Sequence, residues 1–272
     1  MSKIAIVIPA RYASSRFPGK PLAEICGKTM LRRTYDVAVL SSRGTDCEVI
    51  VATEDKRIMD FCEAEGIRSM MTSDSCKTGT DRVCETVRKL SYKPEFIINL
   101  QGDAPLTPPW FLTKMIEKFF EDRDRDSHIM VTPGCVLTWE GLDRLRENKK
   151  TTPFTGTTLI LNQKTSEAIW FSKNIIPAIR DEKKHREVSK SSPIIQHIGL
   201  YGYGYDMLMK FGNLKEGYYE KLESLEQLRI IENGYRIKVV LVDYRGRPSS
   251  SGVDTPEDIK RAETIVREFG EF

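Results

Sequence analysis

The sequence lacks any apolar run long enough to cross a bilayer as a helix, which takes roughly 18–20 residues. The best apolar run, residues 4–10, has the length of a strand. No basic segment followed by a long apolar stretch marks a secretory signal. We therefore expect a globular protein of the cytoplasm with no membrane span.

Histidine is scarce and the excess charge is small. The three histidines are scattered and the six cysteines form no C-x-x-C pair, which argues against a zinc site and, without a signal peptide, favours free thiols. Lys and Arg number 42 against 39 Asp and Glu, a net charge of +3 with both signs interspersed. This balance argues against a nucleic-acid-binding protein, and 40% hydrophobic residues exclude global disorder.

Short apolar runs alternate with amphipathic segments over the first 120 residues. The strands expected there are residues 3–9, 48–53, 68–72 and 95–100, and the expected helices are residues 30–40, 55–64, 78–90 and 108–120. Continuous apolar strands joined by helices are typical of a doubly wound, mostly parallel α/β sheet.

The pattern becomes less regular after about residue 128. Strands of a mixed sheet are expected at residues 130–137, 157–161, 168–172, 195–203 and 237–242, helices at 219–232 and 255–269, and a mobile charged loop at 180–192. No linker composition and no repeat divides the chain. We therefore expect a single domain over residues 1–272.

A basic loop directly follows the first expected strand. Residues 11–20 hold two arginines, one lysine, two serines and a glycine. Cations and close backbone approach at this edge of an α/β sheet suit a polyphosphate. A solvated basic loop is the alternative, and the G-x-x-x-x-G-K-[ST] pattern of a P-loop is absent.

Two aspartates also follow expected strands. Asp103, flanked by Gly102 and a nearby proline, comes after the fourth strand, and Asp254 precedes the helix start at Thr255. Magnesium is commonly held by one or two carboxylates together with phosphates. For both aspartates the alternative is an ordinary turn or helix cap. The helix start at residues 78–82, with its free amides, hydroxyls and arginine, is a weaker candidate for binding a base or a phosphate.

Taken together, these segments resemble the 3-deoxy-manno-octulosonate (Kdo) cytidylyltransferases. The resemblance runs nearly from end to end and includes Gln101-Gly-Asp103. The other matching blocks are residues 9–22, 52–58, 78–82, 170–172, 197–201, 222–229 and 252–258.

This resemblance implies a GT-A-like nucleotide-diphospho-sugar transferase fold, with a nucleotide-binding half at about residues 1–127 and a half for sugar binding and dimerisation at about 128–272. It implies a cytoplasmic homodimer that uses Mg²⁺ and transfers CMP from CTP to an acidic sugar, with release of pyrophosphate, for lipopolysaccharide biosynthesis. The implied catalytic residues are Arg11, Lys20, Asp103 and Asp254, of which Asp103 and Asp254 would hold the metal. The implied CTP-binding residues are Arg11, Ser15, Arg16, Lys20, Thr78, Thr80, Asp81, Arg82 and Gln101. The implied sugar-binding residues are Gln101, Lys173, His197, Tyr201, Glu226 and Gln227.

Three departures from the family pattern bear on the acceptor. Ala104 stands where members commonly have Glu, Lys173 stands where many have Arg, and residues 152–157 lack the family's Asn/Asp-Pro-Asn-x-Val-Lys stretch. Arginine can grip a carboxylate with two parallel hydrogen bonds and lysine cannot. A different ulosonic acid or a phosphonate is therefore an alternative acceptor, and a silent nucleotide-binding paralogue is a third hypothesis.

Overall fold

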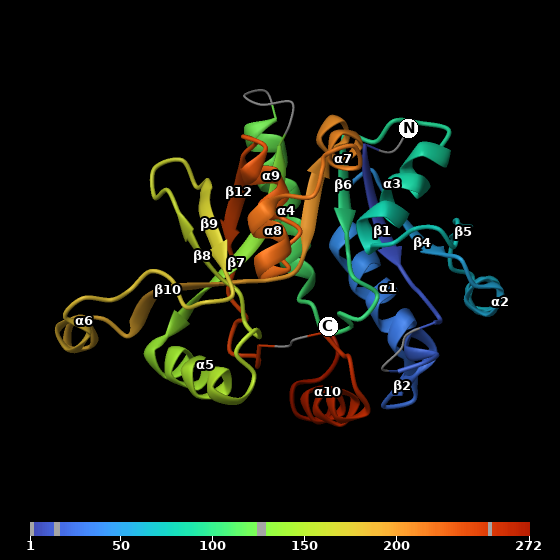
Figure 1. Ribbon diagram of the computed structural model, residues 1–272. Coiled ribbons are helices and arrows are strands. Elements are labelled where there is room, and N and C mark those ends of the chain that lie inside the picture. Colours follow the sequence, from blue (N-terminus) through green and yellow to red (C-terminus); the bar gives the residue numbers. More distant parts are fainter. Residues whose placement is uncertain (1–2, 14–16, 124–128, 250–251) are drawn as a thin grey trace.

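The computed structural model describes residues 3–13, 17–123, 129–249 and 252–272. Among these residues, ten strands form one sheet that runs through the molecule (Figure 1). Its N-terminal part is parallel, in the order β5 (Ser69–Met71), β4 (Cys47–Thr53), β1 (Ile4–Pro9) and β6 (Phe96–Asn99). The strand order reverses next to β1, which is where open α/β sheets bind ligands.

The second part of the sheet is mixed. It continues from β6 through β11 (Tyr201–Gly204), β7 (Met130–Thr138), β10 (Ser191–His197) and β8 (Thr158–Leu161) to β9 (Ala168–Ser172), and these pairings are antiparallel. β12 (Ile237–Leu241) pairs parallel with β7. One sheet therefore spans both halves of the chain.

Both faces of the N-terminal sheet are buried, as its continuous apolar strands predict. Along β1, Ile4, Ile6 and Ile8 pack with α1 (Met30–Ser42) and α4 (Pro109–Asp122). The alternating residues Ala5 and Val7 face the other side and pack with α3 (Gly79–Lys89) and α7 (Tyr205–Phe211). This arrangement confirms the doubly wound α/β fold.

Shorter elements complete the architecture. The remaining helices are α2 (Lys56–Ala64), α5 (Trp139–Thr151), α6 (Glu182–Val188), α8 (Tyr218–Glu223), α9 (Leu228–Glu232), α10 (Pro256–Phe269) and the 3₁₀ helix η1 (Lys20–Leu22), and β2 (Glu24–Ile25) pairs with β3 (Lys28–Thr29). All six cysteines are free, as expected. Within the described ranges, no helix has the length and apolar character that a membrane crossing demands.

The expected helix at residues 219–232 is wrong in one important respect, because the chain breaks it into α8 and α9. Ser224 takes a left-handed conformation with φ 50°. Arg229 of α9 pairs with the buried Glu220 of α8 at 2.5 Å, and Glu232 accepts hydrogen bonds from the amides of Tyr219 and Glu220. These tertiary contacts outweigh the helix propensity of the segment.

The expected strand at residues 195–203 is interrupted between β10 and β11. Both strands pair antiparallel with β7, but four residues separate His197 from Gly202 while two separate their partners Gly134 and Val131. The extra residues of this strand segment, within 198–200, belong to neither strand. The sheet opens at this point, because β11 has β6 as its other neighbour and β10 has β8.

The expected mobile loop at residues 180–192 contains α6 and the start of β10. Glu182 and Arg186 of α6 pair with Arg146 and Asp143 of α5. The run of charges gave no sign of this helix, because its partners lie on α5, a helix that the sequence pattern also did not indicate. The short helix α7 was missed as well.

Candidate active site

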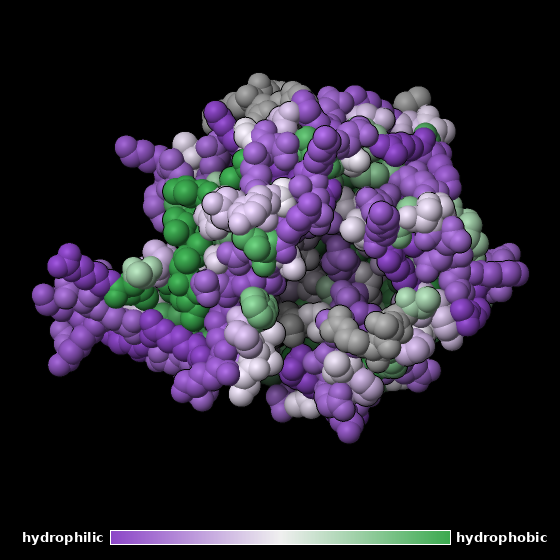
Figure 2. Space-filling view, viewed as in Figure 1, coloured by the Kyte–Doolittle hydropathy of each residue, from purple (hydrophilic) through white to green (hydrophobic). Residues whose placement is uncertain are grey.

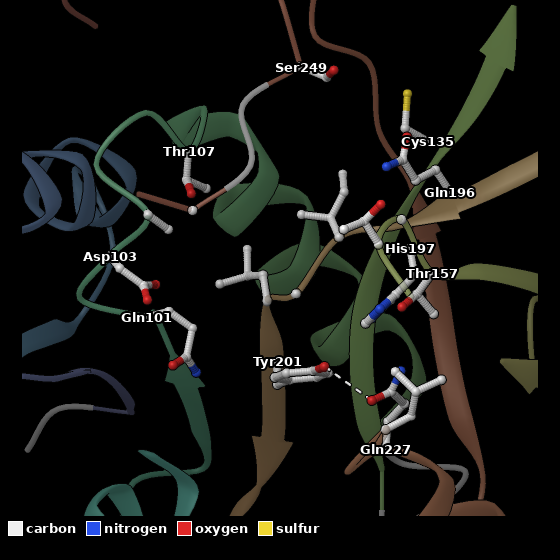
Figure 3. A pocket seen from close by; sticks show the side chains of 18 of the residues that line it. Gln101, Asp103, Thr107, Cys135, Thr157, Gln196, His197, Tyr201, Gln227 and Ser249 are labelled. Carbon is white, nitrogen blue, oxygen red and sulfur yellow. Dashed lines mark hydrogen bonds between the residues drawn. The ribbon is translucent and has the colours of Figure 1, made fainter. Parts of the chain in front are cut away.

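A cleft of about 940 Å³ opens where the sheet splits. One wall comes from residues 100–107 after β6. The facing wall comes from β7, α5, residues 152–157 before β8, β10 and the break between α8 and α9. Figure 3 shows Gln101 and Asp103 on one side, with Thr157, His197 and Gln227 on the other. The space-filling view is hollowed near the middle of the same face (Figure 2). Of the residues assigned from the resemblance, eight line this cleft: Thr80, Gln101, Asp103, Lys173, His197, Tyr201, Glu226 and Gln227.

Asp103 and Asp254 converge on a single cation. Lys20 Nζ lies 2.8 Å from Asp103 Oδ2 and 3.1 Å from Asp254 Oδ1. Burial alone would lower the pKa of Lys20, but the charges and hydrogen bonds of the two carboxylates outweigh it and raise the pKa above its usual value. Three catalytic candidates that are far apart in sequence are therefore in direct contact.

Backbone contacts fix the two carboxylates relative to each other. The amide of Val253 donates to the carbonyl of Asp103 at 2.8 Å, which ties the two segments together. Asp254 itself precedes a helix cap in which Thr255 and Asp258 exchange hydrogen bonds, and its amide donates to Asp258 Oδ2 at 2.9 Å. On the other segment, a Cβ at Gly102 would lie 2.7 Å from the carbonyl oxygen of Pro9, so only glycine allows this approach to the end of β1.

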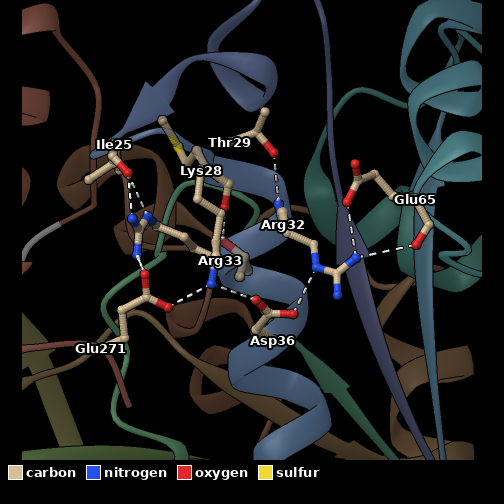
Figure 4. A network of polar contacts seen from close by, with 10 residues as sticks. Ile25, Lys28, Thr29, Arg32, Arg33, Asp36, Glu65 and Glu271 are labelled. Carbon is tan, nitrogen blue, oxygen red and sulfur yellow. Dashed lines mark hydrogen bonds and ion pairs between the residues drawn. The ribbon is translucent and has the colours of Figure 1, made fainter.

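Asp254 lies two residues before α10, and the segment that follows α10 is anchored against β3 and α1. Glu271 pairs with Lys28 at 2.6 Å and with Arg33 at 2.9 Å. Arg33 is 4% exposed and also donates two hydrogen bonds to the carbonyl of Ile25 (Figure 4). The position of Asp254 therefore depends on contacts at both ends of α10.

The donor set at Asp103 and Asp254 suits Mg²⁺. The pair already holds one cation, the Lys20 ammonium, and carboxylate oxygens are the ligands that magnesium takes beside phosphate oxygens. In the part of the chain that the structure describes, no cluster of three or more His, Cys, Asp or Glu side chains offers a closed metal cage. A magnesium ion here would therefore share its coordination with phosphate and water.

His197 lies in the facing wall as a neutral hydrogen-bond acceptor. Thr132 Oγ1 has one proton and donates it to the carbonyl of Leu200 at 2.8 Å. It therefore accepts from His197 Nε2 at 2.8 Å, which leaves Nδ1 of the imidazole unprotonated. Burial, with a smaller effect of the Lys173 charge, lowers the pKa of His197 to about 3.

A polar network surrounds the break between α8 and α9. Thr80 Oγ1 donates to Glu226 Oε1 at 2.5 Å, and Tyr201 donates its hydroxyl to Gln227 Oε1 at 3.2 Å (Figure 3). Burial raises the pKa of Glu226 above its usual value, although the Thr80 bond acts in the opposite direction. Gln227 is 1% exposed, and its Nε2 has no hydrogen-bond partner among the described residues. The helix break thus leaves one buried amide donor unused in a residue that lines the cleft.

Comparisons with known proteins identify the family of this chain. The family model described as cytidylyltransferase matches residues 5–237. A 3-deoxy-manno-octulosonate cytidylyltransferase of Maricaulis maris is 45% identical over the full length of both chains. This chain belongs to the 3-deoxy-manno-octulosonate cytidylyltransferase family. It is therefore a nucleotidyltransferase with the nucleotide-diphospho-sugar transferase fold.

Two further relatives extend this result. A mitochondrial enzyme of the same name from Arabidopsis thaliana is 34% identical over 98% of this chain and 84% of its own length. The structure of a CMP:2-keto-3-deoxy-manno-octonic acid synthetase complexed with CTP superposes with a TM-score of 0.82 at 31% identity, covering 98% of this chain and 99% of that one.

Several residues assigned to CTP in this family have structural roles here. Thr78 and Asp81 form the reciprocal cap of α3, as the helix-start pattern at residue 78 predicted. Arg82 is 1% exposed, pairs with Glu54 at 2.6 Å and contacts Thr72, and it is not among the residues lining the cleft. Helix capping by Thr78 and Asp81 and the buried ion pair of Arg82 thus give these three side chains a role in the fold.

The basic loop is described only in part. Arg11 donates from Nη2 to the carbonyl of Cys76 at 2.5 Å, and Lys20 follows Gly19, whose φ of 72° is a left-handed conformation. Ser15 and Arg16 lie outside the described residues.

Some residues that build the cleft were not predicted. Thr132 orients His197, while Glu223 accepts hydrogen bonds from Ser172 Oγ and from the amide of Lys173 at 2.8 and 2.6 Å. Glu223 lies inside a block that resembles the family, so its position could have been noticed. Thr132 gives no sequence signal, because a threonine in an apolar strand is ordinary.

Proposed function

We propose that this protein transfers the CMP group of CTP to the anomeric hydroxyl of 3-deoxy-manno-octulosonate or a closely related 3-deoxy-ulosonic acid. The hydroxyl oxygen forms a bond to the α-phosphorus, and the bond between the α-phosphorus and the oxygen that bridges the α- and β-phosphates breaks. Pyrophosphate leaves, and the hydroxyl proton is released. The observation that carries the proposal is the Lys20–Asp103–Asp254 cluster at the edge of a cleft with a second, largely neutral wall.

On the nucleotide side, the charged groups position phosphates. Asp103 and Asp254 would hold Mg²⁺, which when bound stabilises negative charge on phosphoryl oxygens and acidifies a hydroxyl. Lys20 lies in contact with both carboxylates and can neutralise the leaving pyrophosphate, together with Arg11. Gln101 lines the cleft and donates to Asn99 at 3.0 Å, which orients its amide beside the nucleotide. No covalent protein nucleophile is required.

On the acceptor side, the wall supplies neutral acceptors and donors for sugar hydroxyls. His197 Nδ1 can accept, and Gln227 Nε2 can donate. Lys173 contributes a cation to this wall. Glu223 accepts a hydrogen bond from the backbone amide of Lys173, so the Lys173 ammonium is the group available to the sugar carboxylate. Burial lowers the pKa of Lys173, while the charge of Glu223 opposes this effect.

A second candidate is the same reaction with another acidic acceptor. Lys173 in place of Arg and the changed residues 152–157 favour it, because both belong to the acceptor wall. The deciding experiment is a pyrophosphate-release assay with CTP, Mg²⁺ and a panel of ulosonic acids and phosphonates. The first proposal expects the highest kcat/KM for 3-deoxy-manno-octulosonate. A higher value for another acid supports the second candidate, and CTP binding without turnover on any acceptor contradicts both.

We also propose that the protein is a homodimer working in the cytoplasm, and that its product serves lipopolysaccharide biosynthesis. Support for dimerisation comes from apolar exposure on the second half. Ile169 on the edge strand β9 is 55% exposed and Val188 at the end of α6 is 83% exposed. Apolar side chains gather on the same side of the molecule in Figure 2. Sedimentation of the protein as a 31.1 kDa monomer at micromolar concentration would contradict the dimer.

A further inference from the structure

Lys149, near the end of α5, lies just before residues 152–157, the part of the acceptor wall where the family pattern is absent. Its ammonium donates to three backbone carbonyls, those of Pro153 at 3.1 Å, Lys173 at 2.5 Å and Thr155. An ammonium has three protons, so all of its donors are engaged. One side chain therefore joins the loop after α5 to the end of β9.

The loop itself is seated closely on α5. Gly156 has φ +66°, and a Cβ there would lie 2.5 Å from Leu145 Cδ1. Thr155 and Thr157 line the cleft, and the carbonyl of Thr157 accepts from the amide of His197 at 2.9 Å. Thr157 and His197 lie across the cleft from Asp103 (Figure 3). A displacement of this loop would therefore move the acceptor wall directly.

We propose that Lys149 is a positioning residue for the acceptor, which fastens residues 153–155 to Lys173 and so fixes the wall of the cleft that faces Asp103. It acts through the loop and does not touch the substrate. Lys149 also places a second positive charge beside Lys173, and burial together with that neighbouring charge lowers the pKa of Lys149. The two ammonium groups favour an acidic acceptor at this part of the wall, whereas the wall's polar side chains His197 and Gln227 are neutral. The expected change in the acceptor KM rests on the proposed function, whereas the contact between Lys149 and the loop does not.

The neighbouring residue offers a matched control. Lys150 is 69% exposed and pairs with Glu147 of the same helix at 2.6 Å. Lys149→Met and Lys150→Met therefore remove the same charge one residue apart, and only the first breaks the contact between the loop and β9. Lys149→Arg restores charge and donors, and Lys149→Gln provides a milder loss if the methionine variant is poorly folded by circular dichroism.

The test combines kinetics with proteolysis of the full chain. For Lys149→Met we expect the acceptor KM to rise about tenfold while the KM for CTP stays within about twofold, with partial rescue in Lys149→Arg. Phe154 is 70% exposed, so chymotrypsin should cleave after it faster in Lys149→Met than in Lys150→Met, as followed by mass spectrometry of the fragments.

Equal cleavage rates and an unchanged acceptor KM in the two methionine variants would overturn the inference. A rise in both KM values would also contradict it, because a positioning role for the acceptor predicts a separation of the two. Absence of turnover in the wild-type protein with every acceptor would instead refute the proposed function, and the proteolysis comparison would still decide whether Lys149 holds the loop.

Discussion

The two walls of the cleft differ in how their polar groups are satisfied. On the β6 side, Asp103, Asp254 and Lys20 form a compact set of charges that neutralise one another. On the β10 side, His197 is neutral, and Gln227 is buried with an unused donor. Charged side chains that are already held in position suit the binding of phosphates and a metal ion. Neutral donors and acceptors instead select sugar hydroxyls through the orientation of their hydrogen bonds. The comparison predicts that substitutions on the two walls affect different kinetic constants.

The largest effect is expected on the charged wall. Asp254→Asn or Asp103→Asn should lower kcat at saturating Mg²⁺ by at least about a hundredfold, because a carboxylate is lost where charge develops in the transition state. Binding of CTP, measured by calorimetry, should persist through Lys20 and Arg11. Asp60→Asn is the control, since Asp60 is exposed and pairs with Lys56 on α2. A folded Asp254→Asn protein that retains over about a tenth of the wild-type kcat would contradict the role of the pair.

A smaller and more selective effect is expected on the neutral wall. Gln227→Ala should raise the acceptor KM about tenfold through loss of one hydrogen bond, with CTP affinity unchanged. Gln163→Ala, at an exposed position before β9, should change neither constant. Steady-state kinetics with each substrate varied in turn provides the measurement. A fall in CTP affinity in Gln227→Ala would mean that the two walls are not separate.

The pH dependence of stability should also distinguish this wall. The pKa of His197 is about 3 in the folded protein and near the usual 6.5 when unfolded, so the unfolded chain binds the additional proton between these values. The contribution of neutral His197 to stability is therefore full above about pH 6.5 and is lost as the pH falls toward 3. Thermal melts should show a shallower loss of Tm between pH 6.5 and 4 in His197→Gln than in the wild type. Equal slopes in His197→Gln and in the wild type would refute the assignment.

The smallest effect is expected at the start of α3. Thr78→Ala removes one member of the reciprocal cap and should lower the free energy of unfolding by about 1 kcal/mol, as measured by urea denaturation. CTP affinity should not change if the hydroxyl serves only the helix. Thr151→Ala, at the C-terminal end of α5, removes a hydroxyl that caps no helix start and should be nearly neutral. If Thr78→Ala lost CTP affinity while its stability was unchanged, Thr78 would have to be assigned to CTP binding.

The nucleotide half was predictable because its signals are local. Apolar runs such as β1, the capping threonine at residue 78 and an aspartate shortly after β6 are each visible in a few consecutive residues. The convergence of Asp103 and Asp254 was expected from two strand ends, but that reason holds only for Asp103, which follows β6. Among the described residues no strand lies between Leu241, where β12 ends, and Asp254, and the hydrogen bond from the Val253 amide to the Asp103 carbonyl brings the two segments together. The acceptor half was less predictable because its geometry depends on distant contacts. Ser224 interrupts a sequence of good helix formers only because α8 and α9 are held by the Glu220–Arg229 pair.

The Lys149 contacts illustrate the same limit. Adjacent lysines at the end of a helix look equivalent in sequence, yet one reaches three carbonyls and the other pairs with Glu147 at the surface. The difference arises from the fold of residues 152–157 onto α5, and that fold depends on Gly156 meeting Leu145. Charge runs such as α6 likewise became interpretable only once their partners on α5 were in place.

The most direct test of the account is the fate of a single oxygen atom. The protein is incubated with CTP, Mg²⁺ and 3-deoxy-manno-octulosonate carrying ¹⁸O at the anomeric hydroxyl, and the products are analysed by mass spectrometry. The account predicts a CMP-sugar that retains the label together with an equal amount of unlabelled pyrophosphate, and no pyrophosphate without an acceptor. Release of pyrophosphate without acceptor, or a labelled pyrophosphate product, would contradict it.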